Sequence, residues 1–418
     1  MRNMGWLLVV GSLSAGLVQA ADSDSPGPVI RISVEVIQLD AVVTDKQGQH
    51  VTDLGPDDFE VLQDGVSQEI SHVTYVRAGE PWVQPRLRAD SPAAAAPAVP
   101  APPRTIVLLY DDLGMTLEGA VRARNALTHV VEGLLATDRV AIISSSKWDG
   151  VLAFSADTEA LKATVADLGF SPRGRDDIAF PTFRASSDFY YGLPFNAAEL
   201  DRNQRIALDS LLVIRRAVEE LKPIDGRKAI ILVSEGFAEL TALEGRYSDG
   251  LIWAMDLPFS DRGDVYETLR RLGDYAARAS VVVHSLDPRG LVTTGPMVAS
   301  AQHGYPPGAQ PVGFHESSRR LINAQAYGAQ ALRNTQASLA YLPHETGGLA
   351  IRDTNDLQGG MERVLTDMSG YYLIGYQPQS ATFEGDKPRF RKIKIGLKST
   401  DLTIRTRRGF YGISDDDI

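Results

Sequence analysis

Continuous apolar runs alternate with amphipathic segments through the middle of the chain. Four short runs, each of which predicts a buried strand, lie at 105–110, 139–143, 228–233 and 281–286. Between the runs, apolar residues recur at intervals of three or four, most clearly over 200–221, which is typical of a helix with one buried face. Strands that alternate with helices predict an α/β domain with a doubly wound, mostly parallel sheet.

Alternation of apolar and polar positions marks both ends of the chain. Residues 28–80 predict several strands, and Asp64-Gly65 between two apolar runs predicts a tight turn. Residues 388–411 predict a C-terminal β-hairpin. Because the N-terminal piece is too short to be stable alone, we expect this hairpin to complete a small β-sandwich-like domain with it. The alternative is that the hairpin extends the edge of the α/β sheet after residues 371–377.

Composition separates these regions further. Residues 81–103 are rich in Pro and Ala, which is typical of an extended linker, and they place the α/β domain at 104–377. Residues 1–20 combine Arg2, an apolar stretch and a small-residue site at 18–20, a pattern that predicts a signal peptide. A short N-terminal anchor is the alternative. We therefore expect a secreted or periplasmic protein, and the remaining sequence contains no apolar stretch long enough to cross a membrane.

Charge and cysteine content exclude several classes of function. The chain has no cysteine, which excludes disulfides, thiolate metal sites, cysteine nucleophiles and a lipidated cysteine. The net charge is −11, whereas a general nucleic-acid-binding protein is usually basic. The basic residues over 387–408 alternate with apolar ones, as on the solvent face of an antiparallel strand. We therefore expect no nucleic-acid partner.

Several motifs together carry a family resemblance. They are a strand that ends in acids at 108–112, the segment 227–236, and the C-terminal segments 371–378 and 407–411. With residues 58–65 near the N-terminus, they are similar to von Willebrand factor A (VWFA-related) domain proteins of the exported bacterial type. The resemblance implies an α/β fold and a non-enzymatic adhesion or scaffold module that binds a protein partner.

The same resemblance implies a magnesium site. The family pattern supplies oxygen ligands from an Asp, two hydroxyl residues, a Thr and a final Asp, which suit Mg²⁺. Asp111 aligns with the first Asp and Glu235 with the last, but Leu113 and Met115 stand at the hydroxyl positions and offer no oxygen. The alternative is that Asp111 and Glu235 cap loops and helix N-termini through hydrogen bonds. If the loop is shifted by one residue, Asp112 and Thr116 can substitute as oxygen ligands. The predicted degenerate metal site therefore consists of Asp111, Asp112, Thr116 and Glu235.

Two catalytic motifs are incomplete, and two other functions stay open. Ser234 follows a strand, but Leu232 replaces the glycine of a nucleophile elbow. His344 lacks the second histidine of a zinc helix, because position 348 is Gly. A hydrolase that uses the carboxylates at the sheet edge and a purely structural envelope protein remain as alternatives.

His284 lies in an apolar strand, so we expect it to be buried and hydrogen-bonded rather than a ligand.

Long loops follow the predicted strands, on the side where doubly wound sheets bind ligands. Residues 171–196, 236–263 and 287–318 mix aromatic residues with Arg, Gly and Pro. Loops of this length are usually functional or disordered, and aromatic residues with Arg are typical of protein-binding faces. The alternative is that the aromatic side chains fill gaps in the core. The predicted partner-binding residues are Phe183, Tyr190, Tyr191 and Trp253.

Overall fold

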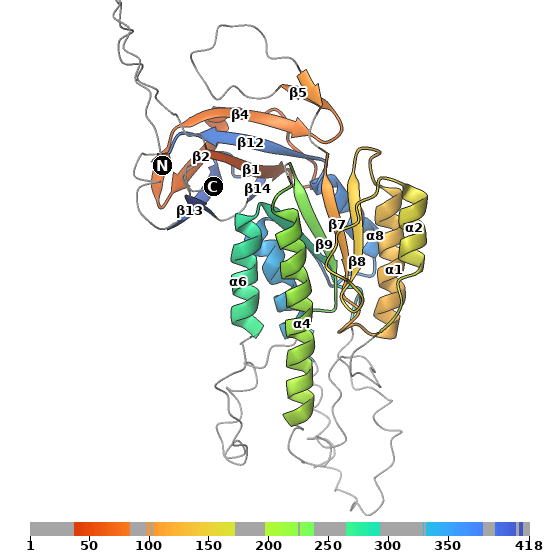
Figure 1. Cartoon of the computed structure of the whole chain (residues 1–418). Helices are drawn as coiled ribbons and strands as arrows, with labels where there is room; N and C mark the ends of the chain where they lie inside the picture. Colours follow the sequence, from red (N-terminus) through yellow and green to blue (C-terminus); the bar gives the residue numbers. More distant parts are fainter. Residues whose placement is uncertain are drawn as a thin grey trace, which may run out of the picture. The chain divides into compact units, whose positions relative to one another are not determined.

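A computed structural model describes ten ranges of the chain, namely 37–83, 98–100, 103–171, 197–224, 226–237, 265–292, 329, 332–378, 389–406 and 409–412. Within them lie a five-stranded parallel sheet with helices on both faces, two four-stranded antiparallel sheets and a two-stranded antiparallel sheet (Figure 1). This architecture confirms the predicted fold class, an α/β domain together with a smaller β-structure. The predicted signal peptide lies outside the described residues.

The parallel sheet has five strands in the order β11-β10-β9-β7-β8. These strands are β7 (Thr105–Tyr110), β8 (Arg139–Ser144), β9 (Lys228–Val233), β10 (Val281–Leu286) and β11 (Ala350–Ile351). All six residues of β7 and of β9 are buried, as expected for strands covered on both faces. The four longer strands confirm the predicted ones, whereas the two-residue edge strand β11 was not predicted.

Helices cover both faces of this sheet. Their bounds are α1 (Leu117–Glu132), α2 (Thr158–Ala166), α4 (Ala197–Leu221), α6 (Val265–Arg278) and α8 (Leu357–Asp367). Figure 1 shows α1, α2 and α8 on one face and α4 and α6 on the other, and each set forms its own buried apolar cluster against the sheet. Alternate residues of β7 point into the two clusters, since Leu108 belongs to the first and Leu109 to the second.

The antiparallel sheets combine strands from both ends of the chain. One has the order β14-β1-β12-β4 and the other β15-β13-β2-β3, and a common core that includes Val61, Ile374, Ile393 and Ile395 joins strands of both. The bounds are β1 (Ile37–Thr44), β2 (Phe59–Gln63), β3 (Val66–Gln68), β4 (Ile70–Arg77), β12 (Gly370–Tyr376), β13 (Arg389–Leu397), β14 (Thr403–Thr406) and β15 (Gly409–Gly412), and a 3-10 turn, η1 (Pro56–Asp58), precedes β2.

One sequence prediction about this region is wrong, and another holds only in part. Residues 371–377 are predicted to lie in the α/β domain, but β12 lies between β1 and β4. The predicted hairpin at 388–411 forms only where β13 pairs with β15, because the first part of the return strand, β14, pairs with β1 instead. The return strand is therefore divided between the two sheets. The expected association with the N-terminal strands is present, since β13 also pairs with β2 and β14 with β1.

Turns agree more closely with the sequence. Asp64 and Gly65 both have positive φ, and they join β2 to β3 with Gln63 paired to Val66, the geometry that favours a glycine in a two-residue hairpin. The predicted linker at 81–103 is not wholly unstructured, because β5 (Pro81–Val83) pairs with β6 (Ala98–Pro100). In the part of the chain that the structure describes, no helix has the length and apolar character of a membrane span.

Candidate functional site

The strand order defines where a ligand would bind. Numbered along the chain, the parallel strands follow the order 2-1-3-4-5 from one edge, so the topological switch point lies between β7 and β9. The chain leaves β7 into α1 on one face, while α4 and α6 cover the other face. Because ligands bind at this crevice in open α/β sheets, the residues that directly follow β7 and β9 form the candidate site.

Asp111, directly after β7, is 2% exposed. Its Oδ1 accepts a hydrogen bond from Ser210 Oγ of α4 and its Oδ2 accepts one from Ser234 Oγ after β9, both at 2.7 Å. Burial raises the pKa of Asp111 above its usual value, while the hydroxyls of Ser210, Ser234 and Ser145 oppose this rise and the charge of Asp112 adds to it. The carboxylate is thus surrounded by hydroxyl groups, which can both donate to it and offer lone pairs to a cation.

Asp112 is also buried, but its partners lie on the other side of β7. Its Oδ1 accepts from Ser144 Oγ at 3.1 Å and from the Ser146 backbone N–H at 3.0 Å. Its Oδ2 accepts from Ser146 Oγ. These residues belong to the turn that follows β8, so Asp112 fixes the neighbouring loop.

Glu235 is 1% exposed and binds the start of α1. Its Oε1 accepts from the Thr116 backbone N–H at 2.9 Å and from Thr116 Oγ1 at 2.6 Å. Thr116 is the N-cap residue of α1, and its Oγ1 accepts from the Gly119 N–H. A Cβ at position 119 would lie 2.2 Å from Glu235 Oε1, so glycine lets the carboxylate approach. The negative charge therefore lies at the positive end of the helix dipole.

We call Asp111, Asp112, Thr116 and Glu235 the carboxyl-edge cluster. The structure brings all four to one edge of the sheet, and each carboxylate has hydroxyl or backbone partners of its own. Leu113 and Met115 are fully buried in the core rather than directed to this cluster. Within the described ranges, no three His, Cys, Asp or Glu side chains gather as a metal-binding group. The hydroxyl-rich surroundings of Asp111 suit a hard cation, and metal binding by the cluster stays a prediction.

The serine residues of this site are hard to recognise in the sequence. Ser210 is 1% exposed, and it lies on the buried face of α4 one turn from Ala207 and Ile214. A small polar residue on an apolar helix face is the only signal, and such a residue usually bonds to its own helix backbone. Ser234 was considered only as a nucleophile; its Oγ instead donates to Asp111 and accepts from the Gly236 N–H.

A second buried polar network closes the carboxyl end of β10. Arg289 donates from Nε to Asp287 Oδ1 at 2.8 Å and from a terminal nitrogen to Oδ2 at 2.7 Å. The same guanidinium donates to Thr335 Oγ1. Gln336 joins this network to Asp353 by a 2.8 Å bond. A two-pronged, fully buried ion pair of this kind holds its loop in one conformation.

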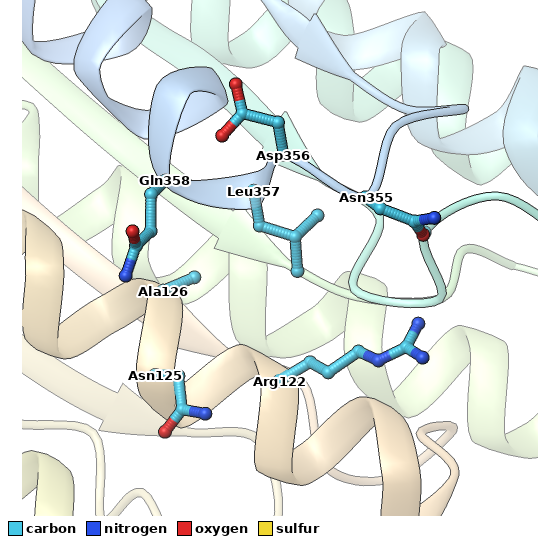
Figure 2. A pocket seen from close by; sticks show the side chains of 8 residues that line it. Arg122, Asn125, Ala126, Asn355, Asp356, Leu357 and Gln358 are labelled. Carbon is cyan, nitrogen blue, oxygen red and sulfur yellow. The ribbon is translucent and has the colours of Figure 1, made fainter.

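A polar pocket of about 400 Å³ lies beside this network. Figure 2 shows Arg122 and Asn125 on α1 and Asn355 and Gln358 at the start of α8, with Leu357 between them. Arg122 donates to the Arg289 carbonyl, and Asn355 Oδ1 accepts from the Leu291 N–H. This pocket could not be predicted from the sequence, because its residues come from three separate segments and form no motif.

The remaining predictions about single residues have different outcomes. The predicted partner-binding residues all lie outside the described ranges, and they remain predictions: Phe183, Tyr190, Tyr191 and Trp253. His284 is 0% exposed, and its Nδ1 accepts a hydrogen bond from the Leu349 N–H. The expectation that His284 is a buried, hydrogen-bonded side chain is therefore confirmed.

Comparison with known proteins gives only distant similarity. No protein-family model matches the sequence, and neither does any curated protein. Similar solved structures include an aerotolerance-related membrane protein from Bacteroides fragilis, at 12% identity over 64% of this chain and 98% of that chain, with a TM-score of 0.32. They also include a von Willebrand factor type A protein from Catenulispora acidiphila, at 10% identity, 91% and 76% coverage and a TM-score of 0.30. The pilus adhesin SpaC from Lactobacillus rhamnosus is similar at 12% identity, 84% and 47% coverage and a TM-score of 0.32. At these values the similarity assigns neither a family nor an activity to this chain.

Proposed function

We propose that this chain is an exported protein-interaction module that binds a protein partner at the carboxyl edge of its parallel sheet. The proposal rests mainly on one observation, which is that the carboxylates at this edge are buried and held by hydrogen bonds from the protein itself. Groups fixed in this way shape a rigid edge, whereas an acid or base in catalysis must reach its substrate. Export is supported by the signal-peptide pattern at 1–20.

The polar pocket beside the cluster supports a polypeptide partner. Asn125, Asn355 and Gln358 place three carboxamides around it, and a carboxamide can donate and accept in the same way as a peptide bond. Arg122 adds a guanidinium, a group that is enriched in protein interfaces. The pocket therefore offers polar groups for a peptide segment, and the aromatic loop residues predicted from the sequence are proposed as further contacts.

A degenerate magnesium site forms part of the proposal. Asp111 with the hydroxyls of Ser210 and Ser234 would supply oxygen ligands, and Glu235 and Asp112 would add charge nearby. A bound divalent cation would offer an open coordination position to an acidic group of the partner. Because Leu113 and Met115 remove two hydroxyl ligands of the family pattern, we propose that binding of the partner does not depend on the cation.

Hydrolysis is the second candidate, and one contact relates to it. Ser234 Oγ donates to Asp111 Oδ2 at 2.7 Å, but Ser234 is 1% exposed and a nucleophile must be reached by its substrate. The geometry therefore favours binding over hydrolysis.

Site-specific photo-crosslinking in the producing cell tests the proposal. A photoreactive amino acid replaces Asn125 at the pocket in one variant and Gln47, in an exposed turn of the β-structure, in a matched control. We expect a covalent adduct with a single protein from position 125 and none from position 47. Adducts from position 47 alone, or from both positions equally, would contradict binding at the carboxyl edge.

A further inference from the structure

His284 contacts both ends of one segment of the chain. On one side its Nδ1 accepts from the backbone N–H of Leu349, the residue before β11, at 3.1 Å. On the other side its Nε2 lies 3.9 Å from Oδ2 of Asp367, the last residue of α8. Residues 349–367 contain β11, the N-terminus of α8 and one wall of the polar pocket. A single buried ring therefore bonds to one end of this segment and lies beside the carboxylate at its other end.

The hydrogen bond from Leu349 determines which ring nitrogen carries the proton. A nitrogen that accepts a hydrogen bond has no proton, so neutral His284 carries its proton on Nε2 and directs it toward Asp367. A protonated imidazole is a donor at both nitrogens. Protonation would therefore bring the new Nδ1 proton against the Leu349 N–H and remove one of the bonds that hold the edge strand, the others being its backbone bonds to Ser285 and Asp287.

Three charged residues from different parts of the chain act on His284. Asp367 lies on α8, Arg227 directly precedes β9, and Arg405 lies on β14. We call these three residues and His284 the junction cluster. His50 lies near the cluster as well, since its Nε2 is 2.8 Å from the Thr366 carbonyl oxygen. The two guanidiniums disfavour a protonated His284 ring, whereas the Asp367 carboxylate favours it. Within the described residues, four buried polar atoms of the junction cluster have no hydrogen bond: His284 Nε2, Asp367 Oδ2, Arg227 Nε and Arg405 Nη1.

We propose that His284 is a proton-sensitive clasp, which holds residues 349–367 against β10 when it is neutral and releases β11 and the pocket wall when it is protonated. Burial lowers the pKa of His284 to about 4, the charge of Asp367 opposes this shift, and the charges of Arg227 and Arg405 add to it. The clasp therefore stays closed at neutral pH. Its opening becomes easier as pH falls from about 6.5 toward 4, because only the released ring takes up the proton readily.

The consequence of release can be followed along the chain. β11 pairs with β10 through only two residues, Ala350 and Ile351. Beyond it, Asp353 accepts from Gln336, and Asn355 accepts from the Leu291 N–H at the pocket. Loss of the Leu349 bond would leave the edge strand that positions these two contacts with its backbone bonds to Ser285 and Asp287, which makes it easier to open. Acid would thus loosen the pocket wall while the interior strands of the sheet remain paired.

Hydrogen exchange of the full chain tests the clasp. Protection factors, corrected for the intrinsic pH dependence of exchange, are compared between pH 7 and 4.5 for residues 349–351 and for β7. We expect the protection of 349–351 relative to β7 to fall about tenfold per pH unit below about pH 6.5. The ¹⁵N shifts of the His284 ring, measured at neutral pH, should show a bare Nδ1 and a protonated Nε2.

Two variants complete the test. His284→Asn keeps an oxygen that can accept from Leu349 but cannot be protonated, so its segment should stay protected at pH 4.5. His129→Gln is the matched control, because His129 lies 3.1 Å from Glu362 of α8 yet does not touch Leu349; it should lose protection as the parent chain does. A proton on Nδ1 at neutral pH would overturn the proposal, and this ring measurement decides the question even if His284→Asn does not fold. Equal acid loss of protection in the parent chain and in His284→Asn would overturn it as well.

Discussion

The carboxyl-edge cluster and the junction cluster are both buried, yet their polar atoms are satisfied to different degrees. At the carboxyl edge, Asp111 and Glu235 accept hydrogen bonds of 2.6–2.9 Å from hydroxyls and backbone amides. At the junction, Asp367 Oδ1 accepts a direct hydrogen bond from Arg405, whereas its Oδ2 lies 3.8 Å from Arg227 and 3.9 Å from His284. Neutral donors fix a carboxylate in place, whereas charged and titratable neighbours leave the energy of the site dependent on which groups are ionised. The difference predicts a rigid carboxyl edge and a proton-sensitive junction.

Removal of the junction carboxylate should have the largest effect. Asp367→Ala would leave Arg227 and Arg405 without their buried counter-charge, and we expect the free energy of unfolding to fall by about 3–5 kcal/mol. Urea denaturation measures the change. Asp401→Ala is the control, because it breaks the exposed ion pair with Lys46 and should cost under about 1 kcal/mol. Equal losses in the two variants would show that the junction charges do not stabilise the fold.

The pH dependence of stability should separate the two clusters next. The ordinary pKa of His284 is 6.5, and burial lowers it to about 4 in the folded chain. Between these values the unfolded chain binds one more proton, so stability should fall with decreasing pH, by about 3 kcal/mol in all. Denaturation curves at several pH values should show a smaller slope for His284→Asn than for the parent chain. Parallel slopes would mean that other groups dominate acid unfolding.

The cap on α1 should give a smaller effect. Glu235→Ala removes both hydrogen bonds to Thr116, and we expect a loss of about 2 kcal/mol in the free energy of unfolding. Glu235→Gln keeps an acceptor oxygen, so its free energy of unfolding should fall by about half as much as that of Glu235→Ala. Thermal unfolding followed by circular dichroism measures both variants. If Glu235→Gln destabilises the fold as much as Glu235→Ala, the charge of Glu235 contributes more to stability than its hydrogen bonds.

Magnesium should give the smallest effect. A cation at one hundred times its dissociation constant would stabilise the folded chain by about 2.7 kcal/mol. Because Leu113 and Met115 replace two hydroxyl ligands, we expect millimolar Mg²⁺ to raise the melting temperature far less than a stabilisation of about 2.7 kcal/mol would raise it. Asp111→Ala is the control. A large rise that Asp111→Ala abolishes would instead establish a functional cation site in the carboxyl-edge cluster.

The four long strands of the parallel sheet were predictable because each is a continuous apolar run. The same rule misplaced β12, since nearly all of its residues are buried and it therefore reads like a parallel strand, although it is antiparallel and central in another sheet. β11 could not be predicted, because two residues show no periodicity. In each case the apolar pattern reports burial on both faces and contains no information about the neighbouring strand.

The candidate site was predictable in part for a related reason. Asp111 and Glu235 were found because acids that end buried strands stand out in sequence. Ser210 reaches Asp111 from α4, 99 residues along the chain, and Arg122 of α1 shares its pocket with Asn355 and Gln358 only because α8 packs beside α1. His284 was correctly expected to be buried, but its contact with Leu349 depends on the pairing of β11, which the sequence does not reveal.

The position of β12 between β1 and β4 has a consequence for how the protein is made. β1 and β4 do not pair with each other, and each bonds to a strand that is synthesised after the whole α/β domain. A nascent chain that emerges N-terminus first therefore carries these strands with open edges until residues 370–376 arrive. Open strand edges promote association between chains, and pairing that is distant in sequence forms slowly. We expect the period between synthesis of β4 and of β12 to be when this chain most needs a chaperone.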